Sequence, residues 1–211
     1  MKGYLFDLDG TLLDSNKMWR SLTTNFLNRH KIIFTEEIAQ ELTTMSIYKS
    51  AGYLRHKLKV NLAEEEIIRE LEKEIIKGYT NEVKLKDGAL EYLSYLKEMG
   101  IPMGLATATN DRFVDLIMER FDLEKYFDFI ATVDNIGILK NNPNFYIEAV
   151  KQFPFKPSEV AIFDDAPYAI EAAVKAGLRV YVVYDQVNKS FYEGSKKIAY
   201  KGIESFREMI I

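Results

Sequence analysis

The sequence predicts an α/β protein with a Rossmann-like core, built on a parallel sheet, and an inserted all-helical subdomain. From residue 101 onward, short apolar runs alternate with segments of helical spacing, which is typical of parallel strands joined by crossover helices. One earlier apolar run covers residues 3–8, and helical spacing then continues to about residue 99. That block is too long for a single crossover. The predicted domains are therefore a core of residues 1–14 and 81–211 and a helical domain of residues 15–80.

Periodicity and capping signals predict the elements of the core. Asn142 followed by Pro143 is a typical N-cap and first helical residue. Asp87 is the predicted N-cap of a helix with the apolar stripe Ala89, Leu90, Leu93 and Leu96, which ends before Gly100. The expected strands are 3–8, 101–106, 129–133, 160–163 and 179–184, and the later helices are 110–121, 143–152, 166–176 and about 202–210.

Two apolar stripes carry the prediction of helices in the inserted domain. One consists of Met18, Trp19, Leu22 and Phe26, and the other of Ile67, Ile68, Leu71 and Ile75. Gly78 follows the second stripe, where the residue after a helix is often glycine, so we expect that helix to end there.

Composition excludes several classes of protein. With 211 residues, 47% hydrophobic and 28% charged, the chain is globular rather than disordered. The absence of cysteine excludes disulfides, thiolate metal sites and a cysteine nucleophile. A net charge of −4 without a basic block gives no sign of nucleic-acid binding, and no apolar run approaches the ~18–20 residues of a membrane span. We expect a soluble cytoplasmic monomer.

Acidic residues follow the first predicted strand. Asp7 and Asp9 close an otherwise apolar run, and two buried like charges would repel by ~4 kcal/mol at about 4 Å and an effective dielectric near 20. A hard cation such as Mg²⁺ would relieve that repulsion, since its preferred ligands are oxygen atoms. Gly10 allows a tight turn directly after the second acid. The alternative is a solvated acidic turn.

Other strand ends carry polar residues at the same predicted edge of the sheet. Thr107 and the backbone after it could bind an anion at a helix N-terminus, although Thr109 or Asn110 could simply cap that helix. Asp164 and Asp165 follow the strand at 160–163, and Asp165 could equally be a helix N-cap. The cation that this acidic edge needs could be Lys140, although a loop lysine is usually solvated. Taken together, these strand ends predict one site.

The string FDLDGTLLDS resembles the first motif of the haloacid dehalogenase-like (HAD) superfamily. The later order is also similar to that superfamily's motifs: Thr107, then Lys140 three residues before Pro143, then the pair Asp164 and Asp165. The likeness covers residues 4–180. The helical insertion resembles the C1-type cap of the branch that contains phosphoglycolate phosphatase and beta-phosphoglucomutase.

The resemblance implies a Mg²⁺-dependent phosphatase that hydrolyses a small phosphorylated metabolite. Asp7 would be the nucleophile that forms an aspartyl-phosphate. Asp9 would be the general acid and base, and its backbone carbonyl would bind Mg²⁺. The remaining implied roles are charge stabilisation by Lys140, phosphate binding by Thr107, Ala108 and Lys140, and completion of the metal site by Asp164 and Asp165, with Asp165 favoured as the direct ligand.

Departures from the family pattern bear on the alternatives. Asn141 stands where the third motif often has proline. Beta-phosphoglucomutases usually have valine and histidine where this chain has Thr11 and Trp19, which weakens the mutase alternative. Dehalogenases lack the second acid, here Asp9, and a binding protein that merely kept the fold would not need every motif acid. The candidate specificity residues of the cap are Asn16, Trp19, Tyr48, Lys49, Arg55 and His56.

Overall fold

The computed structural model of the protein describes residues 1–43 and 45–210. The chain forms two compact units, which we call the core unit (Met1–Asn16 with Lys84–Ile211) and the helical unit (Lys17–Val83). The units therefore divide after residue 16 rather than 14, and after residue 83 rather than 80.

The core unit is built on a six-stranded sheet in the order β3-β2-β1-β4-β5-β6, and every strand pair is parallel. This confirms the predicted α/β class with a Rossmann-like parallel sheet. The strands are β1 (Gly3–Phe6), β2 (Met103–Thr107), β3 (Phe129–Thr132), β4 (Val160–Asp164), β5 (Arg179–Val183) and β6 (Lys201–Ile203).

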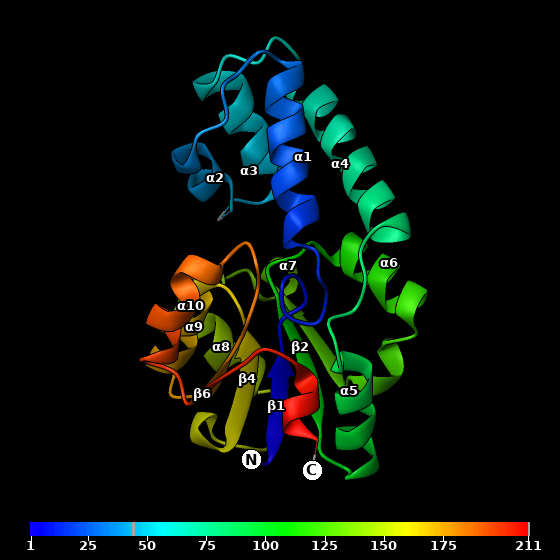
Figure 1. Ribbon diagram of the computed structural model, residues 1–211, viewed down its shortest axis with the longest axis vertical. Coiled ribbons are helices and arrows are strands. Elements are labelled where there is room, and N and C mark those ends of the chain that lie inside the picture. The colour runs from blue at the N-terminus through cyan, green and yellow to red at the C-terminus, as the bar shows by residue number, and fades with distance from the viewer. Residues whose placement is uncertain (44, 211) are drawn as a thin grey trace. The chain divides into compact units, whose positions relative to one another are not determined.

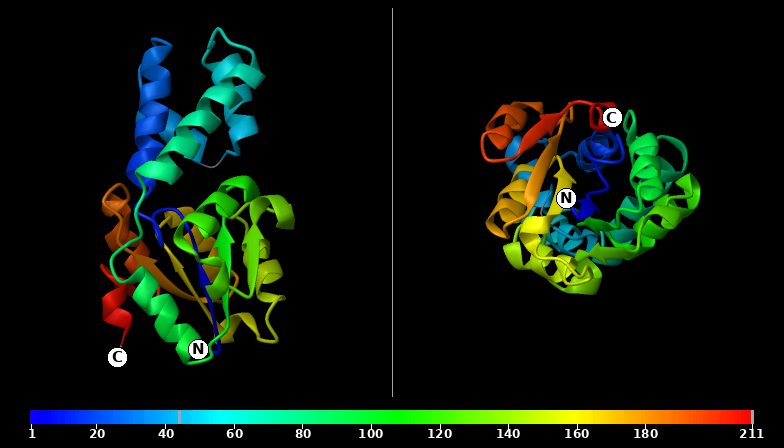
Figure 2. Two further views of the ribbon diagram at one scale, coloured as in Figure 1. Left: turned by 90° about the vertical axis from the view of Figure 1, so that its right-hand side faces the viewer. Right: turned by 90° about the horizontal axis from the view of Figure 1, so that it is seen from below.

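Helices cover both faces of this sheet (Figures 1 and 2). The helices of the core unit are α5 (Ala89–Glu98), α6 (Asp111–Phe121), α7 (Val133–Ile136), α8 (Pro143–Val150), α9 (Pro167–Lys175) and α10 (Lys189–Lys196). Short 3₁₀ turns are η2 (Glu124–Tyr126), η3 (Pro157–Glu159) and η4 (Phe206–Met209). On the α5 face the core is aromatic, and Phe6 stacks on Phe163 with ring centres 5.1 Å apart. On the other face α8 and α9 pack against the apolar side chains of the central strands.

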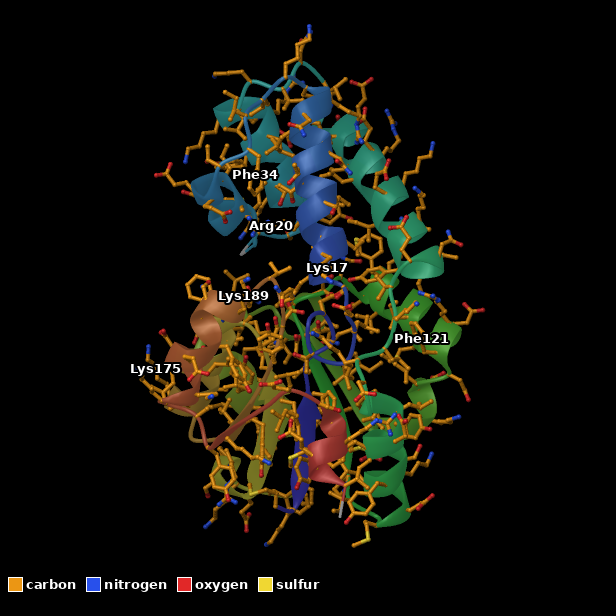
Figure 3. The ribbon with its side chains drawn as sticks, viewed as in Figure 1. Lys17, Arg20, Phe34, Phe121, Lys175 and Lys189 are labelled. Carbon is orange, nitrogen blue, oxygen red and sulfur yellow. The ribbon has the colours of Figure 1, made fainter. Side chains whose placement is uncertain are left out.

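The helical unit has its own apolar core. Its elements are α1 (Asn16–Arg29), which begins at the last residue of the core unit, α2 (Glu36–Thr43), α3 (Ile47–Gly52), the π-helical turn η1 (Tyr53–Lys57) and α4 (Glu64–Asn81). Its buried side chains include Phe26, Leu54 and Ile67. The guanidinium carbon of Arg20 lies over the ring of Phe34, 5.5 Å from its centre, and so makes a cation–π contact in this unit (Figure 3). None of the described helices in either unit is long and apolar enough to cross a membrane.

Two predicted helix ends are wrong for tertiary reasons. α4 continues past Gly78 to Asn81. Gly78 is buried inside the helix, where the absence of a side chain leaves room for Met18: a Cβ there would lie 2.6 Å from the Met18 Cγ. The N-cap of α5 is Gly88 rather than Asp87. The Asp87 carboxylate instead accepts hydrogen bonds from the Ser205 hydroxyl at 2.6 Å and the Arg207 Nε at 3.0 Å.

The C-terminal segment also differs from the prediction. Instead of one helix over about 202–210, the chain forms strand β6 and the turn η4. β6 pairs with the otherwise open edge of β5, and η4 buries Phe206 at 1% exposure among the aromatic rings of the α5 face. Helix α10, which precedes β6, was not predicted at all.

Replacing Phe206 by alanine should reveal how much this short segment contributes to stability. We expect Phe206→Ala to lower the free energy of unfolding by ~3–5 kcal/mol, since it removes a buried ring from a packed cluster. Phe191→Ala is the matched control, because Phe191 is 49% exposed and its loss should cost less than ~0.5 kcal/mol. Urea unfolding of both variants measures the difference, and equal losses would contradict the packing argument.

Candidate active site

Three acids and one lysine meet at the carboxyl ends of the central strands. Phe6 is opposite Phe163 in the sheet, so Asp7 and Asp164 leave β1 and β4 side by side. The Asp7 amide donates to the Phe163 carbonyl at 3.0 Å, which fixes this register. Asp7, Asp164 and Asp165 each offer an oxygen atom within 4.8 Å of the others. The structure therefore brings together aspartates that are more than a hundred residues apart in the chain.

Lys140 is the cation within this cluster. It lies between α7 and α8, is 3% exposed, and its ammonium pairs with Asp7 and, at 2.8 Å, with Asp164. Burial alone lowers the pKa of Lys140, but the negative charges of Asp164 and Asp7 outweigh it and leave the pKa raised. Lys140 is thus held in its charged form by the acids that it neutralises.

The acids remain in excess of this one cation. Burial raises the pKa of Asp7 well above its usual range, opposed by Lys140 and reinforced by Asp164 and Asp165. Burial also raises the pKa of Asp165 to about 7, with the charges of Asp164 and Asp185 adding to the effect. With all three carboxylates ionised, the cluster and its one ammonium would carry a net charge of −2, which a divalent cation would balance. Oxygen donors that are this close and this buried fit Mg²⁺.

Neutral donors hold Asp165 in place. Its Oδ1 accepts a hydrogen bond from the Thr11 hydroxyl at 3.2 Å, and its Oδ2 accepts from the side-chain amides of Asn16 at 2.8 Å and Asn188 at 2.7 Å. Gly10 has φ +79°, and a Cβ there would lie 2.4 Å from that same Oδ2, so only glycine fits this turn. Asp165 is therefore no helix cap.

Asp164, rather than Asp165, bonds to the start of the following helix. Its Oδ1 accepts from the Ala166 amide at 3.0 Å, and Ala166 is the N-cap of α9. The sequence left open whether Asp165 is the N-cap of this helix, since it directly precedes Ala166 and Pro167. The tertiary donors around Asp165 decide between the two.

A second ion pair fastens the loop that carries Asn188. The Lys86 ammonium donates to the Asp185 Oδ2 at 2.7 Å and to the Tyr184 carbonyl at 3.1 Å, and the side chain of Asp185 is 1% exposed. The Asp185 Oδ1 accepts from the Val187 amide at 2.8 Å. These contacts fix the chain after β5, and so they fix the amide that reaches Asp165.

The end of β2 supplies hydroxyl groups. Thr107 and Thr109 are buried, and the Thr107 hydroxyl both accepts from the Thr109 amide and donates to the Thr109 hydroxyl, each at 3.1 Å. The Thr109 hydroxyl donates to the Asp9 Oδ2 at 2.5 Å. The residue that caps α6 is Asn110, whose side chain accepts from the Arg112 amide. Ala108 lies exposed between the two threonines.

Comparison with known proteins identifies the family. The family model described as haloacid dehalogenase-like hydrolase matches residues 4–183. The chain belongs to this family. It is 26% identical over 189 residues to a phosphorylated carbohydrates phosphatase of Thermotoga maritima, a match that covers 89% of this chain and 88% of that protein.

Solved structures of the family share the fold. CbbY from Rhodobacter sphaeroides in complex with phosphate is 24% identical with a TM-score of 0.80, covering 99% of this chain and 96% of that one. Beta-phosphoglucomutase from Clostridium difficile is 17% identical with a TM-score of 0.77, covering 99% and 93%. The family model confirms the predicted HAD superfamily resemblance, and these solved structures confirm the fold.

The predicted specificity residues have different surroundings. Asn16 belongs to the core unit and contacts Asp165, as described above. Within the helical unit, Trp19 packs edge-on against Tyr79, Arg55 donates to the Leu62 carbonyl, and His56 pairs with Glu64 at 2.7 Å. Tyr48 and Lys49 are exposed on α3. Their role in specificity stays a prediction.

Several residues of this HAD site were missed as functional candidates. Thr109 was considered only as a cap, and Thr11 only as a departure from a family pattern. No strand-end pattern predicted Asn188, although the chain leaves β5 at the same edge of the sheet as it leaves β4. Applying the same rule to β5 would have pointed to Asp185 and Asn188.

Replacing Lys140 should show how much the acid cluster lowers the free energy of unfolding when its cation is absent. Without Mg²⁺, Lys140→Met leaves buried carboxylates without their cation, so we expect the free energy of unfolding to fall by ~3–5 kcal/mol. Adding Mg²⁺ should recover part of this loss through binding to the folded state. Lys151→Met is the control, since its pair with Glu148 is exposed and worth at most about 1 kcal/mol. Urea unfolding with EDTA or Mg²⁺ tests this, and equal stability of the two variants would disprove the charge argument.

Proposed function

We propose that this protein is a Mg²⁺-dependent phosphatase that hydrolyses a small phosphomonoester through an aspartyl-phosphate on Asp7. Its membership of a hydrolase family, together with relatives named as phosphatases, bears out the coarser prediction of a phosphohydrolase. The observation that carries the finer proposal is the buried cluster of Asp7, Asp164 and Asp165 at the sheet edge, in which Lys140 pairs with Asp7 and Asp164.

The residues present fit a bound Mg²⁺. In the proposal Asp7, Asp164 and Asp165 hold it with carboxylate oxygens and Asp9 with its backbone carbonyl, and Asp165 is the favoured direct ligand. When bound, the ion would reduce the repulsion between a carboxylate nucleophile and an anionic phosphate and orient the two for in-line attack. The neutral hydrogen bonds to Asp165 support this role, because they orient the carboxylate without cancelling its charge.

Lys140 and the end of β2 would bind the phosphoryl group. The buried ammonium of Lys140 lies against Asp7, so it can stabilise charge on phosphoryl oxygens as Asp7 attacks. Thr107 is the last residue of β2 and Ala108 follows it. The Ala108 amide could donate to another phosphoryl oxygen, and so could the Thr107 hydroxyl once it turns away from the Thr109 hydroxyl. Thr107 is held by the sheet and the buried Lys140 by its two ion pairs, which favours pre-organised stabilisation of the transition state.

The reaction would proceed in two balanced steps. In the first, a carboxylate oxygen of Asp7 forms a bond to phosphorus, the ester P–O bond breaks, and the proton of Asp9 passes to the leaving oxygen. In the second, water attacks phosphorus, Asp9 takes a proton from that water, and the Asp7 carboxylate leaves with the electron pair of the broken bond. Inorganic phosphate and the free alcohol are the products.

A phosphorylated carbohydrate is the substrate class that the relatives favour. The Thermotoga protein is named for phosphorylated carbohydrates, and the structure of CbbY holds phosphate. Trp19, Tyr48, Lys49, Arg55 and His56 of the helical unit remain the proposed specificity residues, and the protein is proposed to act as a monomer.

A phosphatase assay tests the proposal directly. Phosphate release from p-nitrophenyl phosphate and a panel of sugar, nucleotide and glycolate phosphates should require Mg²⁺ and stop with EDTA. Asp7→Asn should lower turnover by more than ~10³-fold while circular dichroism shows a folded protein. Asp14→Asn, an exposed acid of the same sequence motif, should keep its activity. Absence of metal-dependent release from every substrate would refute the proposal.

A phosphosugar mutase is the second candidate, favoured by the structural likeness to beta-phosphoglucomutase. Thr11 argues against it, since its hydroxyl bonds to Asp165 at a position where those enzymes usually have valine. We expect no conversion of beta-glucose 1-phosphate to the 6-phosphate, with or without a bisphosphate primer. Primer-dependent conversion, measured with a coupled dehydrogenase, would establish the mutase instead.

A further inference from the structure

A chain of hydroxyl groups leads from β2 to Asp9. The Thr107 hydroxyl donates its hydrogen to the Thr109 hydroxyl at 3.1 Å, and the Thr109 hydroxyl donates its own hydrogen to the Asp9 Oδ2 at 2.5 Å. The Thr109 amide in turn donates to the Thr107 oxygen at 3.1 Å. Thr109 is 8% exposed, and its contact joins segments that are 100 residues apart.

The number of hydrogens on each hydroxyl group fixes which group donates and which accepts in this series of hydrogen bonds. A hydroxyl has one hydrogen to donate, and the Thr109 hydrogen is used on Asp9. Asn110, not Thr109, caps α6, so helix capping does not account for the Thr109 hydroxyl. A hydroxyl that donates to an ionised carboxylate forms a charge-assisted hydrogen bond, which is stronger than a neutral one.

We propose that Thr109 is a positioning residue that selects which oxygen of Asp9 carries the transferable proton. Because the Thr109 hydrogen occupies Oδ2, a proton on Asp9 is confined to Oδ1, and the rotation of the carboxyl group is fixed. This inference rests on the proposed function, in which Asp9 protonates the leaving oxygen. The proton leaves Oδ1 as the ester P–O bond breaks, and it returns to Asp9 from the attacking water.

The consequence is a dependence on the leaving group. An alkoxide leaving group needs the proton of Asp9, whereas p-nitrophenolate departs without one. Misplacing that proton should therefore slow the hydrolysis of an alkyl phosphate and leave p-nitrophenyl phosphate almost unaffected. A merely structural role of Thr109 would slow both substrates alike.

The experiment compares kcat/KM, which covers the steps up to formation of the phosphoenzyme, for these two substrates. Thr109→Val should lower kcat/KM for the best alkyl phosphate of the panel by about 10- to 100-fold, part of the ~10²–10⁴-fold typical of general acid catalysis. The value for p-nitrophenyl phosphate should change by less than about 3-fold. Thr109→Ser keeps the hydroxyl and should restore both values.

Thr132→Val is a matched control. Thr132 is fully buried and its hydroxyl also donates to an aspartate, but that partner is Asp111, outside the site. It should affect the two substrates equally, if at all. If Thr109→Val does not fold, as judged by circular dichroism, the pair Thr109→Ala and Thr109→Ser provides the same comparison.

Two results would overturn the inference. An equal loss for both substrates in the folded Thr109 variant, or no loss for the alkyl phosphate, would refute the positioning role while the phosphatase proposal stood. A wild-type protein without metal-dependent activity on either substrate would refute both.

Discussion

The buried ion pairs of Lys140 with Asp7 and Asp164 are the interaction on which the core unit's site depends. Taking such charges out of water costs several kcal/mol per ion, and hydrophobic residues in the same space would usually be as stable or more so. The cluster therefore adds little to folding by itself. An arrangement that costs stability and still leaves acids in excess is what a site for a cation and an anionic ligand requires.

The parallel sheet explains why this much could be predicted from sequence. Strands whose carboxyl ends share an edge place the residues at those ends together, so Asp7 after β1 and Asp164 at the end of β4 had to be neighbours once both strands were recognised. Apolar runs and helix caps gave the strands and the pair Asn142 and Pro143, which the structure confirms as the start of α8. The features that could be predicted were those set by local sequence or by the shared edge of the sheet.

The remainder depends on partners that no local pattern contains. Gly78 alone predicts a helix end, but in the fold Met18 packs against it inside the helix. Asp87 alone predicts a helix cap, but in the fold its carboxylate bonds to Ser205 and Arg207. Strand β6 exists because β5 offers an open edge, whereas its own sequence also suits a helix. Asn188 has no neighbouring motif, and only the folded loop after β5 brings it to Asp165.

The acids of this site differ less in sequence than in the donors that the fold assigns to them. Asp7 and Asp164 share the Lys140 ammonium, whereas the hydrogen bonds that Asp165 accepts from described residues come from neutral donors, which orient its carboxyl group without adding a positive charge. Asp9 is two residues from Asp7, yet β1 has ended by then and the turn at Gly10 follows, so Asp9 meets the hydroxyl of Thr109, after the end of β2, instead of the ammonium. Different environments give identical side chains different chemistry. In the proposed reaction Asp7 attacks beside a cation and Asp9 carries a proton beside a hydroxyl, and both environments follow from where β1 ends.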